Sequence, residues 1–183
     1  MAIAARKLTY ADLVRLPDDG NRHEIVGGEE IVTPAPNISH QRVVFRLGRL
    51  LAEYVESQRL GEVLPAPVDV ALSKHDIVEP DLVFVSKKRI SLIRANRIQG
   101  VPDLLIEVSS PSTAALDRGR KRDLYERSGV REYWIADLFA QIVEVHEFGR
   151  ARRMQIHREG RTFRSAVLPG FSLDVEALFR ASR

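Results

Sequence analysis

Two apolar stretches, each carrying an acidic residue, constrain the fold of this chain most strongly. In Val78–Val85, Asp81 stands before Leu-Val-Phe-Val, and in Pro102–Ser109, Glu107 interrupts a run of Leu, Ile and Val. Short apolar runs of this kind predict strands in the core of a sheet. A carboxylate in such a strand is costly to bury unless it is paired, hydrogen-bonded or neutralised by a cation. The two acids therefore indicate a site for a hard metal ion.

Length and composition limit the class of protein. The 183 residues, 44% of them hydrophobic, suffice for one sizeable core, and we expect a single domain over residues 1–183. The chain has no cysteine, which excludes disulfides, thiolate metal ligands and a cysteine nucleophile. It lacks a run of about 18 apolar residues, and its first charges, Arg6 and Lys7, follow a very short apolar stretch, the reverse of a secretory signal. We expect a soluble cytoplasmic protein without a membrane partner.

Helical and strand patterns alternate along the chain and predict a mixed α/β fold. Apolar residues recur at helical spacing over 39–55, and a second helix is expected from Ser112 or Thr113 to Arg127, with Gly129 as its left-handed end. A short helix is expected over 9–16. Strands are expected at 22–26, 29–33, 62–66, 68–72, 82–85, 104–108, 133–136, 141–146, 154–156 and 162–166.

Five short motifs, taken in order, resemble one known family. They are HEIVGGE at 23–29, SHQ at 39–41, EPD at 79–81, PDLLIEVSSPST at 102–113 and GVREYW at 129–134. Together they are similar to the Uma family of restriction endonucleases in the PD-(D/E)XK superfamily, over nearly the whole chain. The resemblance implies a restriction-endonuclease-like fold, a mixed central β-sheet flanked by helices. It also implies a Mg²⁺-dependent hydrolase that cuts DNA phosphodiester bonds, with Mn²⁺ as a substitute ion.

The resemblance assigns Asp81 as the central aspartate and Glu107 as the acid of the (D/E)XK element, and it makes Glu24 the candidate third ligand. Mg²⁺ prefers oxygen ligands and retains waters, so one or two carboxylates and a substrate phosphate suffice. Such an ion polarises the phosphodiester and helps to form hydroxide. The alternative is structural: Asp81 caps a turn after Pro80, Glu107 makes a hydrogen bond, and Glu24 lies on the polar side of a hairpin.

The chain departs from the family pattern at the lysine. Two residues after the acid, where strand periodicity would place a lysine on the same face, stands Ser109. The resemblance makes Lys121, on the following helix, the replacement. Asp117 and Tyr125 lie four residues before and after it and share its helix face. The alternative is a solvated ion pair between Asp117 and Lys121, which is worth little.

Other candidates are weaker. His40 and Gln41 begin the long helix and are auxiliary candidates, because a histidine there can bind a phosphate or shuttle protons. The alternative for His40 is a surface or packing role. We expect Asp103 to cap or orient its strand and Trp134 to lie in the core rather than to stack on a base.

The basic residues allow a nucleic-acid partner. The net charge is +3 and the isoelectric point about 9.4, which permits contact with phosphates without requiring it. Lys87 and Lys88, and Arg118 and Arg122, are the candidate DNA contacts, and the loop 86–100 is suited to lining a groove. The alternative is that these are solvated faces. Neighbours in the two clusters are Arg89, Arg94, Arg97 and Arg120, and a third group of Arg150, Arg152 and Arg153 is expected at the surface.

Three functions remain open from the sequence. The first is a metal-dependent endodeoxyribonuclease, with a homodimer expected by analogy to similar folds. The second is a nuclease-fold protein that lost efficient cleavage and acts as a nucleic-acid-binding or assembly module, which Ser109 favours. The third is an enzyme acting on a small phosphate ester. Because the paired acids Asp81 and Glu107 would repel each other, neutralising either is expected to leave the metal-free fold intact or more stable.

Overall fold

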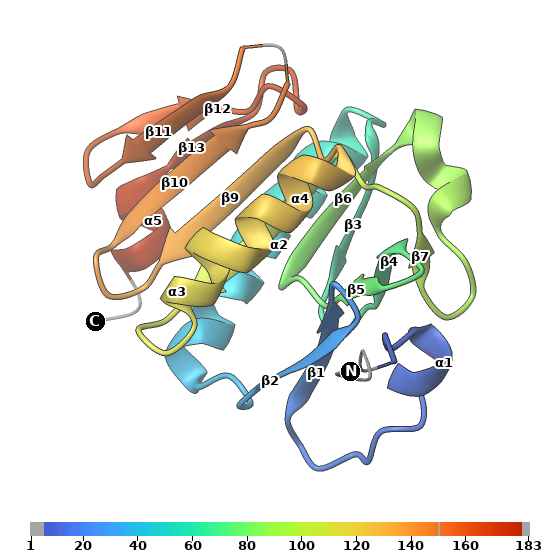
Figure 1. Ribbon diagram of the computed structural model, residues 1–183. Helices are drawn as coiled ribbons and strands as arrows, with labels where there is room; N and C mark the ends of the chain where they lie inside the picture. The colour runs from blue at the N-terminus through green and yellow to red at the C-terminus, as the bar shows by residue number, and fades with distance from the viewer. Residues whose placement is uncertain (1–5, 150, 181–183) are drawn as a thin grey trace.

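A six-stranded mixed sheet forms the centre of the molecule (Figure 1). The computed structural model describes residues 6–149 and 151–180. Strands β8 and β9 are parallel, and the other neighbours are antiparallel. In sheet order, the strands are β11 (Arg153–His157), β10 (Ile142–Glu147), β9 (Glu132–Asp137), β8 (Leu104–Ser109), β6 (Leu82–Ser86) and β3 (Gly61–Pro65). The predicted mixed central sheet is confirmed.

A second, five-stranded mixed sheet stands beside the first and was not predicted. Its order is β2 (Glu29–Thr33), β1 (Arg22–Val26), β5 (Asp76–Val78), β4 (Val70–Ser73) and β7 (Ile98–Gln99). Strands β1 and β2 form an antiparallel hairpin with Gly27 and Gly28 in its turn, so both strands predicted there are present. Strands β5 and β7 span three and two residues, too few to show a periodicity, so the sheet they complete escapes sequence reasoning.

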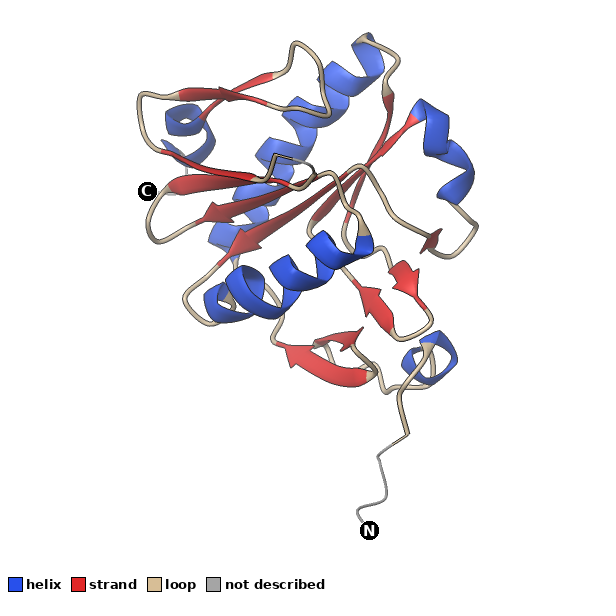
Figure 2. Cartoon of the chain, turned by 45° about the horizontal axis from the view of Figure 1, so that its top comes forward, coloured by secondary structure: helices blue, strands red, loops and turns tan. Residues whose placement is uncertain are grey.

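Helices cover both faces of the central sheet (Figure 2). Helix α2 (Ile38–Ser57) buries its apolar stripe against the same face as Ile106 and Val108 of β8. On the other face, α4 (Arg122–Ser128) buries Leu124 against Leu105 and the edge of the second sheet. The side chains of β8 alternate between the two faces, so Ile106 and Val108 pack on the α2 side and Leu105 packs on the α4 side.

The helix after β8 is irregular. The sequence predicts one α-helix over 113–127, but the structure divides the run into α3 (Ala114–Leu116), a π-helical segment η2 (Asp117–Lys121) and α4. Gly129 ends it at a φ of 86°, the left-handed cap expected there. The N-terminal helix α1 (Tyr10–Leu13) is also shorter than the predicted range.

The C-terminal segment closes the α2 side of the sheet. It comprises β12 (Thr162–Arg164), β13 (Ser172–Asp174) and α5 (Val175–Phe179), of which the last two were not predicted. Buried Glu132 of β9 links this segment to the central sheet. Its Oε2 accepts hydrogen bonds from the backbone amides of Ala166 at 2.7 Å and Val167 at 3.1 Å. Within the part of the chain that the structure describes, no helix is long and apolar enough to cross a membrane.

Candidate active site

The sheet register brings the two predicted acids together. Leu82 of β6 pairs with Ile106 of β8 in antiparallel register, so the next position outward sets Asp81 opposite Glu107. Directly opposite residues in antiparallel strands point to the same face. Both acids are buried, with 2% and 3% of their surface exposed. Because neither faces open solvent, each needs a partner.

Asp81 is held by two basic side chains and a backbone amide. Arg22 Nη2 donates to its Oδ1 at 3.0 Å, His40 Nε2 lies 3.1 Å from Oδ2, and the amide of Val108 donates to Oδ2 at 2.7 Å. Burial acts to raise the pKa of Asp81, but the hydrogen bond from His40 and the charge of Arg22 outweigh it and hold this pKa below its usual value. Asp81 is therefore a carboxylate.

Lys121 occupies the space between the other two acids. Its Nζ lies 2.9 Å from Glu107 Oε1 and 2.8 Å from Glu24 Oε2, and only 3% of Lys121 is exposed. Tyr125, one turn along the helix, donates to the same Glu107 oxygen at 2.8 Å. The alternative of a solvated ion pair between Lys121 and Asp117 is wrong.

The π-helical segment sets the direction of this lysine. Residues in a π turn are spaced by five rather than four along the hydrogen-bond ladder, so one extra residue rotates the side chains that follow. The segment η2 ends at Lys121 and buries both Lys121 and Asp117 toward the sheet. Such insertions occur often at functional sites. Here the π-helical segment directs the side chain of Lys121 toward Glu107.

Arg22 belongs to the cluster and was missed by sequence reasoning. It lies two residues before Glu24 on β1, so strand periodicity turns both side chains to the same face. Besides Asp81, its Nε contacts Glu79 Oε1 at 2.9 Å, and the amide of Glu79 donates to Glu24 Oε1 at 2.8 Å. The spacing Arg22-x-Glu24 was the signal in the sequence that could have placed Arg22 beside Glu24.

Acids outnumber the fixed cations of this cluster. Burial raises the pKa of Glu107 to about 8, and the neighbouring acids add to this against the opposing charge of Lys121. Burial also raises the pKa values of Glu79 and Asp117. Burial alone would lower the pKa of Lys121, but Glu107 and Glu24 raise it overall, so Lys121 stays charged. The acids of the cluster are Glu24, Glu79, Asp81, Glu107 and Asp117, against the permanent charges of Arg22 and Lys121.

An oxygen-only donor set with excess negative charge fits a hard divalent cation. In the conformation described, no group of three or more acids and histidines among residues 6–149 and 151–180 is placed to hold an ion. Lys121 separates Glu24 from Glu107, while Arg22 and His40 hold Asp81. The structure also removes the premise that Asp81 and Glu107 repel each other unopposed, so neutralising Asp81 is not expected to stabilise the metal-free fold.

The remaining candidates lie outside the acid cluster or beside it. Ser109 is fully buried two residues beyond Glu107, and His40 touches the cluster. Gln41 is exposed and lines a separate groove on α2. Asp103 accepts a hydrogen bond from the amide of Ser86, an orienting contact as expected, and Trp134 is in the core.

The basic clusters are placed less favourably than predicted. Lys87 and Lys88 follow the opposite end of β6 from Asp81, roughly 20 Å away along an extended strand. Their DNA contact stays a prediction, while Arg94 and Arg97 farther along that loop line a cavity. Other arginines are already paired within the protein: Arg118 with Asp137 and Glu144, Arg120 with Glu29, Arg122 with Asp123, and Arg152 with Glu126. Arg153 is exposed as expected, and Arg150 lies outside the described residues.

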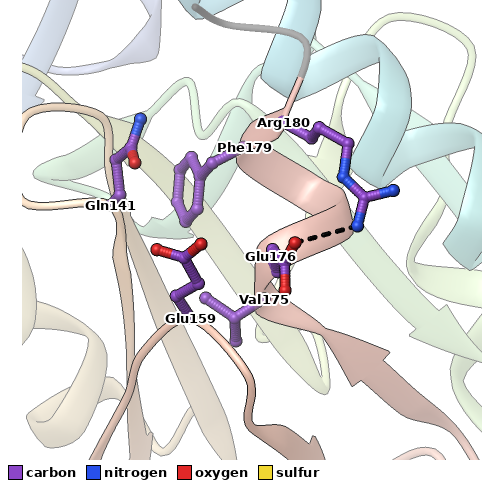
Figure 3. A pocket seen from close by; sticks show the side chains of 6 residues that line it. All are labelled: Gln141, Glu159, Val175, Glu176, Phe179 and Arg180. Atoms are coloured by element: carbon purple, nitrogen blue, oxygen red, sulfur yellow. Dashed lines mark hydrogen bonds and ion pairs between the residues drawn. The ribbon is translucent and has the colours of Figure 1, made fainter.

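Two cavities meet at the acid cluster. One of about 30 Å³ is lined by Asp81, Glu107, Asp117 and Lys121, among others. The other, a cleft of about 230 Å³, opens next to it between the β2–α2 loop and the β8–α3 loop. A further pocket of about 250 Å³ lies against α5 and shares no lining residue with these two (Figure 3). Its Glu176 and Arg180 pair with each other at 2.9 Å.

Comparison with known proteins places the chain in a family. The family model Uma2, described as "Putative restriction endonuclease", matches residues 10–176. The chain belongs to the Uma2 family. The chain is also 24% identical over 151 residues to "Uncharacterized protein sll1609" of Synechocystis sp. (strain ATCC 27184 / PCC 6803 / Kazusa), an alignment that covers 80% of this chain and 85% of that protein.

A solved structure confirms the predicted mixed α/β fold. It is the crystal structure of a "putative nuclease belonging to DUF820" from Anabaena variabilis ATCC 29413. The two folds agree with a TM-score of 0.80 over 96% of this chain and 99% of that one, at 18% sequence identity. Both sheets and the helices around them are therefore those of a known architecture.

Proposed function

We propose that this Uma2-family protein is a Mg²⁺-dependent endodeoxyribonuclease that also accepts Mn²⁺. One observation carries the proposal: acids from separate elements meet a buried lysine at the place where the strand-borne lysine of the superfamily is missing. Glu24 comes from β1, Asp81 from the position just before β6, Glu107 from β8 and Lys121 from the π segment. A lysine from the helical run thus takes the place of the lysine that the superfamily pattern puts at position 109 of the strand.

Each residue then has a distinct task. Asp81 and Glu107 are the principal metal ligands and Glu24 is the auxiliary one. A bound Mg²⁺ would supply Lewis-acid polarisation of the phosphodiester and a more acidic water. Arg22 and His40 fix the direction of the Asp81 carboxylate through the contacts described above. Lys121 turns its ammonium from the acids to the scissile phosphate, where its charge offsets the charge that develops in the transition state.

A second candidate function is favoured by the closure of the cluster. Lys121 is sealed between two carboxylates, and the acid-lined cavity of about 30 Å³ has room for roughly one water molecule. A protein that stays in this state would bind nucleic acid or assemble with partners on a nuclease fold without cutting. A homodimer is proposed for either function by analogy to related folds.

The two candidates differ in the nicking of supercoiled plasmid DNA. We expect wild-type protein to nick it with Mg²⁺ or Mn²⁺ and not with chelator. Glu107→Gln should lower the rate by roughly 10²- to 10³-fold, because the variant has no carboxylate there to bind the metal and to orient Lys121. Glu53→Gln, on the exposed side of α2, is the matched control and should cut like wild type.

Three outcomes of that assay would contradict the proposal in different ways. Binding of DNA without nicking under either ion would favour the binding or assembly module. Hydrolysis of small phosphate esters with intact plasmid would favour the third function. Equal rates for wild type and Glu107→Gln would show that cleavage comes from elsewhere.

A further inference from the structure

The cleft next to the acid cluster differs from it in charge. It shares Arg22, Thr33, His40 and Thr113 with the acid-lined cavity, so the two are continuous. None of its lining residues is acidic, whereas the smaller cavity is lined by Asp81, Glu107 and Asp117. Such an arrangement suits an anion placed beside a cation site.

Two helix beginnings face this cleft. Asn37 is the N-cap of the 20-residue helix α2, and its side chain accepts from the amide of His40 at 2.9 Å. Thr113 is the N-cap of the continuous helical run from Ala114 to Ser128. The amide end of each helix carries a partial positive charge that favours anions. The helix ends alone do not define a ligand, but both contribute partial positive charge to the cleft.

An unpaired nitrogen in the same place points to a ligand. His40 is 9% exposed, and its Nε2 is engaged by Asp81. Its Nδ1, on the other side of the ring, is buried and has no hydrogen-bond partner among the described residues. A buried polar atom without a partner is unfavourable, so such a site is normally completed by water or a ligand.

The walls of the cleft are stiff. Pro34 and Pro36 fix the backbone of one wall, and Pro111 fixes the turn between Ser110 and Ser112 on the other. Hydroxyl groups of the second wall lie within reach of one another, with Ser110 Oγ 2.9 Å from Ser112 Oγ. These groups can redirect their hydrogens to an oxygen ligand at little cost, because a hydroxyl rotates to suit its partner.

We propose that this cleft binds a backbone phosphate of the nucleic acid next to the phosphate that is cleaved. The proposal rests on the proposed function for the identity of the neighbouring site. It adds the path of the substrate, which runs from the acid cluster between the β2–α2 loop and the β8–α3 loop. It also places His40 between the two sites, since its Nε2 contacts Asp81 and the residue lines the cleft.

Carboxylates introduced into either wall test the proposal. Ser112→Glu and Ala35→Glu place a negative charge on exposed residues of opposite walls and should each weaken binding of a fluorescent DNA duplex by roughly 10-fold, the scale of one charge-assisted hydrogen bond. The log–log slope of affinity against salt should become shallower by about 0.9, the value for one phosphate that the protein no longer neutralises. Ser57→Glu, at the far end of α2 and roughly 30 Å from Asn37, is the matched control and should bind like wild type.

Measurements of DNA binding and of Mn²⁺ binding distinguish a failure of the cleft proposal from a failure of the nuclease proposal. Anisotropy is measured both with chelator and with Mg²⁺, and Mn²⁺ affinity is measured by calorimetry, which the two wall variants should leave unchanged. Weakened binding in Ser112→Glu and Ala35→Glu without any nicking by wild type would support the cleft while refuting the nuclease. Equal affinity in all variants, or no DNA binding by wild type, would overturn the cleft. Thermal stabilisation by inorganic phosphate without DNA binding would assign the cleft to a free anion instead.

Discussion

Replacing Lys121 with alanine is expected to reduce DNA cleavage by roughly 10²- to 10³-fold, the scale of removing one preorganised contact to a transition state. The same change should not lower Mn²⁺ affinity, because the ammonium now lies between Glu24 and Glu107 and competes with a metal ion for them. Single-turnover cleavage and titration calorimetry give the two quantities. A lower rate with equal or tighter metal binding is the signature of a transition-state contact.

Two further variants separate this role from a general loss of charge. Lys74→Ala removes an exposed lysine from the turn between β4 and β5 and should leave the rate unchanged. In the Lys121→Ala background, Ser109→Lys should restore part of the rate, since Ser109 projects from the same face of β8 as Glu107. Wild-type rates in Lys121→Ala would eliminate this lysine from catalysis.

Replacing Lys121 with methionine is expected to cost about 3–5 kcal/mol of unfolding free energy in the metal-free protein, the usual result of leaving buried charges without a partner. The cost should depend on pH. Glu107 already has a folded pKa of about 8 against 4.5 ordinarily, so the folded state takes up a proton and stability falls as pH rises through that window. Without Lys121 this pKa rises further. Both proteins should lose stability alike as pH rises from 4.5 to about 8, so the gap between variant and wild type should widen only above about pH 8, where Glu107 has ionised in wild type but still holds its proton in the variant.

Urea denaturation across pH measures this effect, and a divalent ion should reverse it. Mn²⁺ replaces the missing positive charge in the variant, so it should stabilise Lys121→Met by about 2.7 kcal/mol at an ion concentration of 100 times the variant's dissociation constant, and should stabilise wild type by less at the same concentration. A gap that is constant with pH, or Mn²⁺ stabilisation equal in both proteins, would mean that Lys121 only fills space.

Sequence reasoning found those parts of the site that local pattern determines. Asp81 and Glu107 stood out because a carboxylate in a run of Val, Leu and Ile contradicts its surroundings, and the register of β6 and β8 sets them face to face. Lys121 was reached through the family resemblance and the absence of a lysine at Ser109. The metal, catalytic and DNA-binding roles of these residues stay predictions, as do the single domain, the homodimer and the cytoplasmic location.

The remaining parts depend on contacts between distant segments. Arg22 looked like an ordinary polar residue of a hairpin strand, and only folding brings it to Asp81, 59 residues later. Nothing in the composition of Asp117–Lys121 distinguishes a π segment from an α-helix, because the choice is made by packing against the sheet. Strands β5 and β7 are held by their neighbours and carry no periodicity of their own.

Anomalous diffraction from a crystal soaked in Mn²⁺ shows whether Asp81 and Glu107 hold a divalent ion. We expect one strong peak within bonding distance of carboxylate oxygens of both residues, with Lys121 displaced from between Glu24 and Glu107. Crystals of Glu107→Gln should lose that peak. A wild-type crystal in which the peak is absent, or lies away from these acids while Lys121 keeps both ion pairs, would contradict the account.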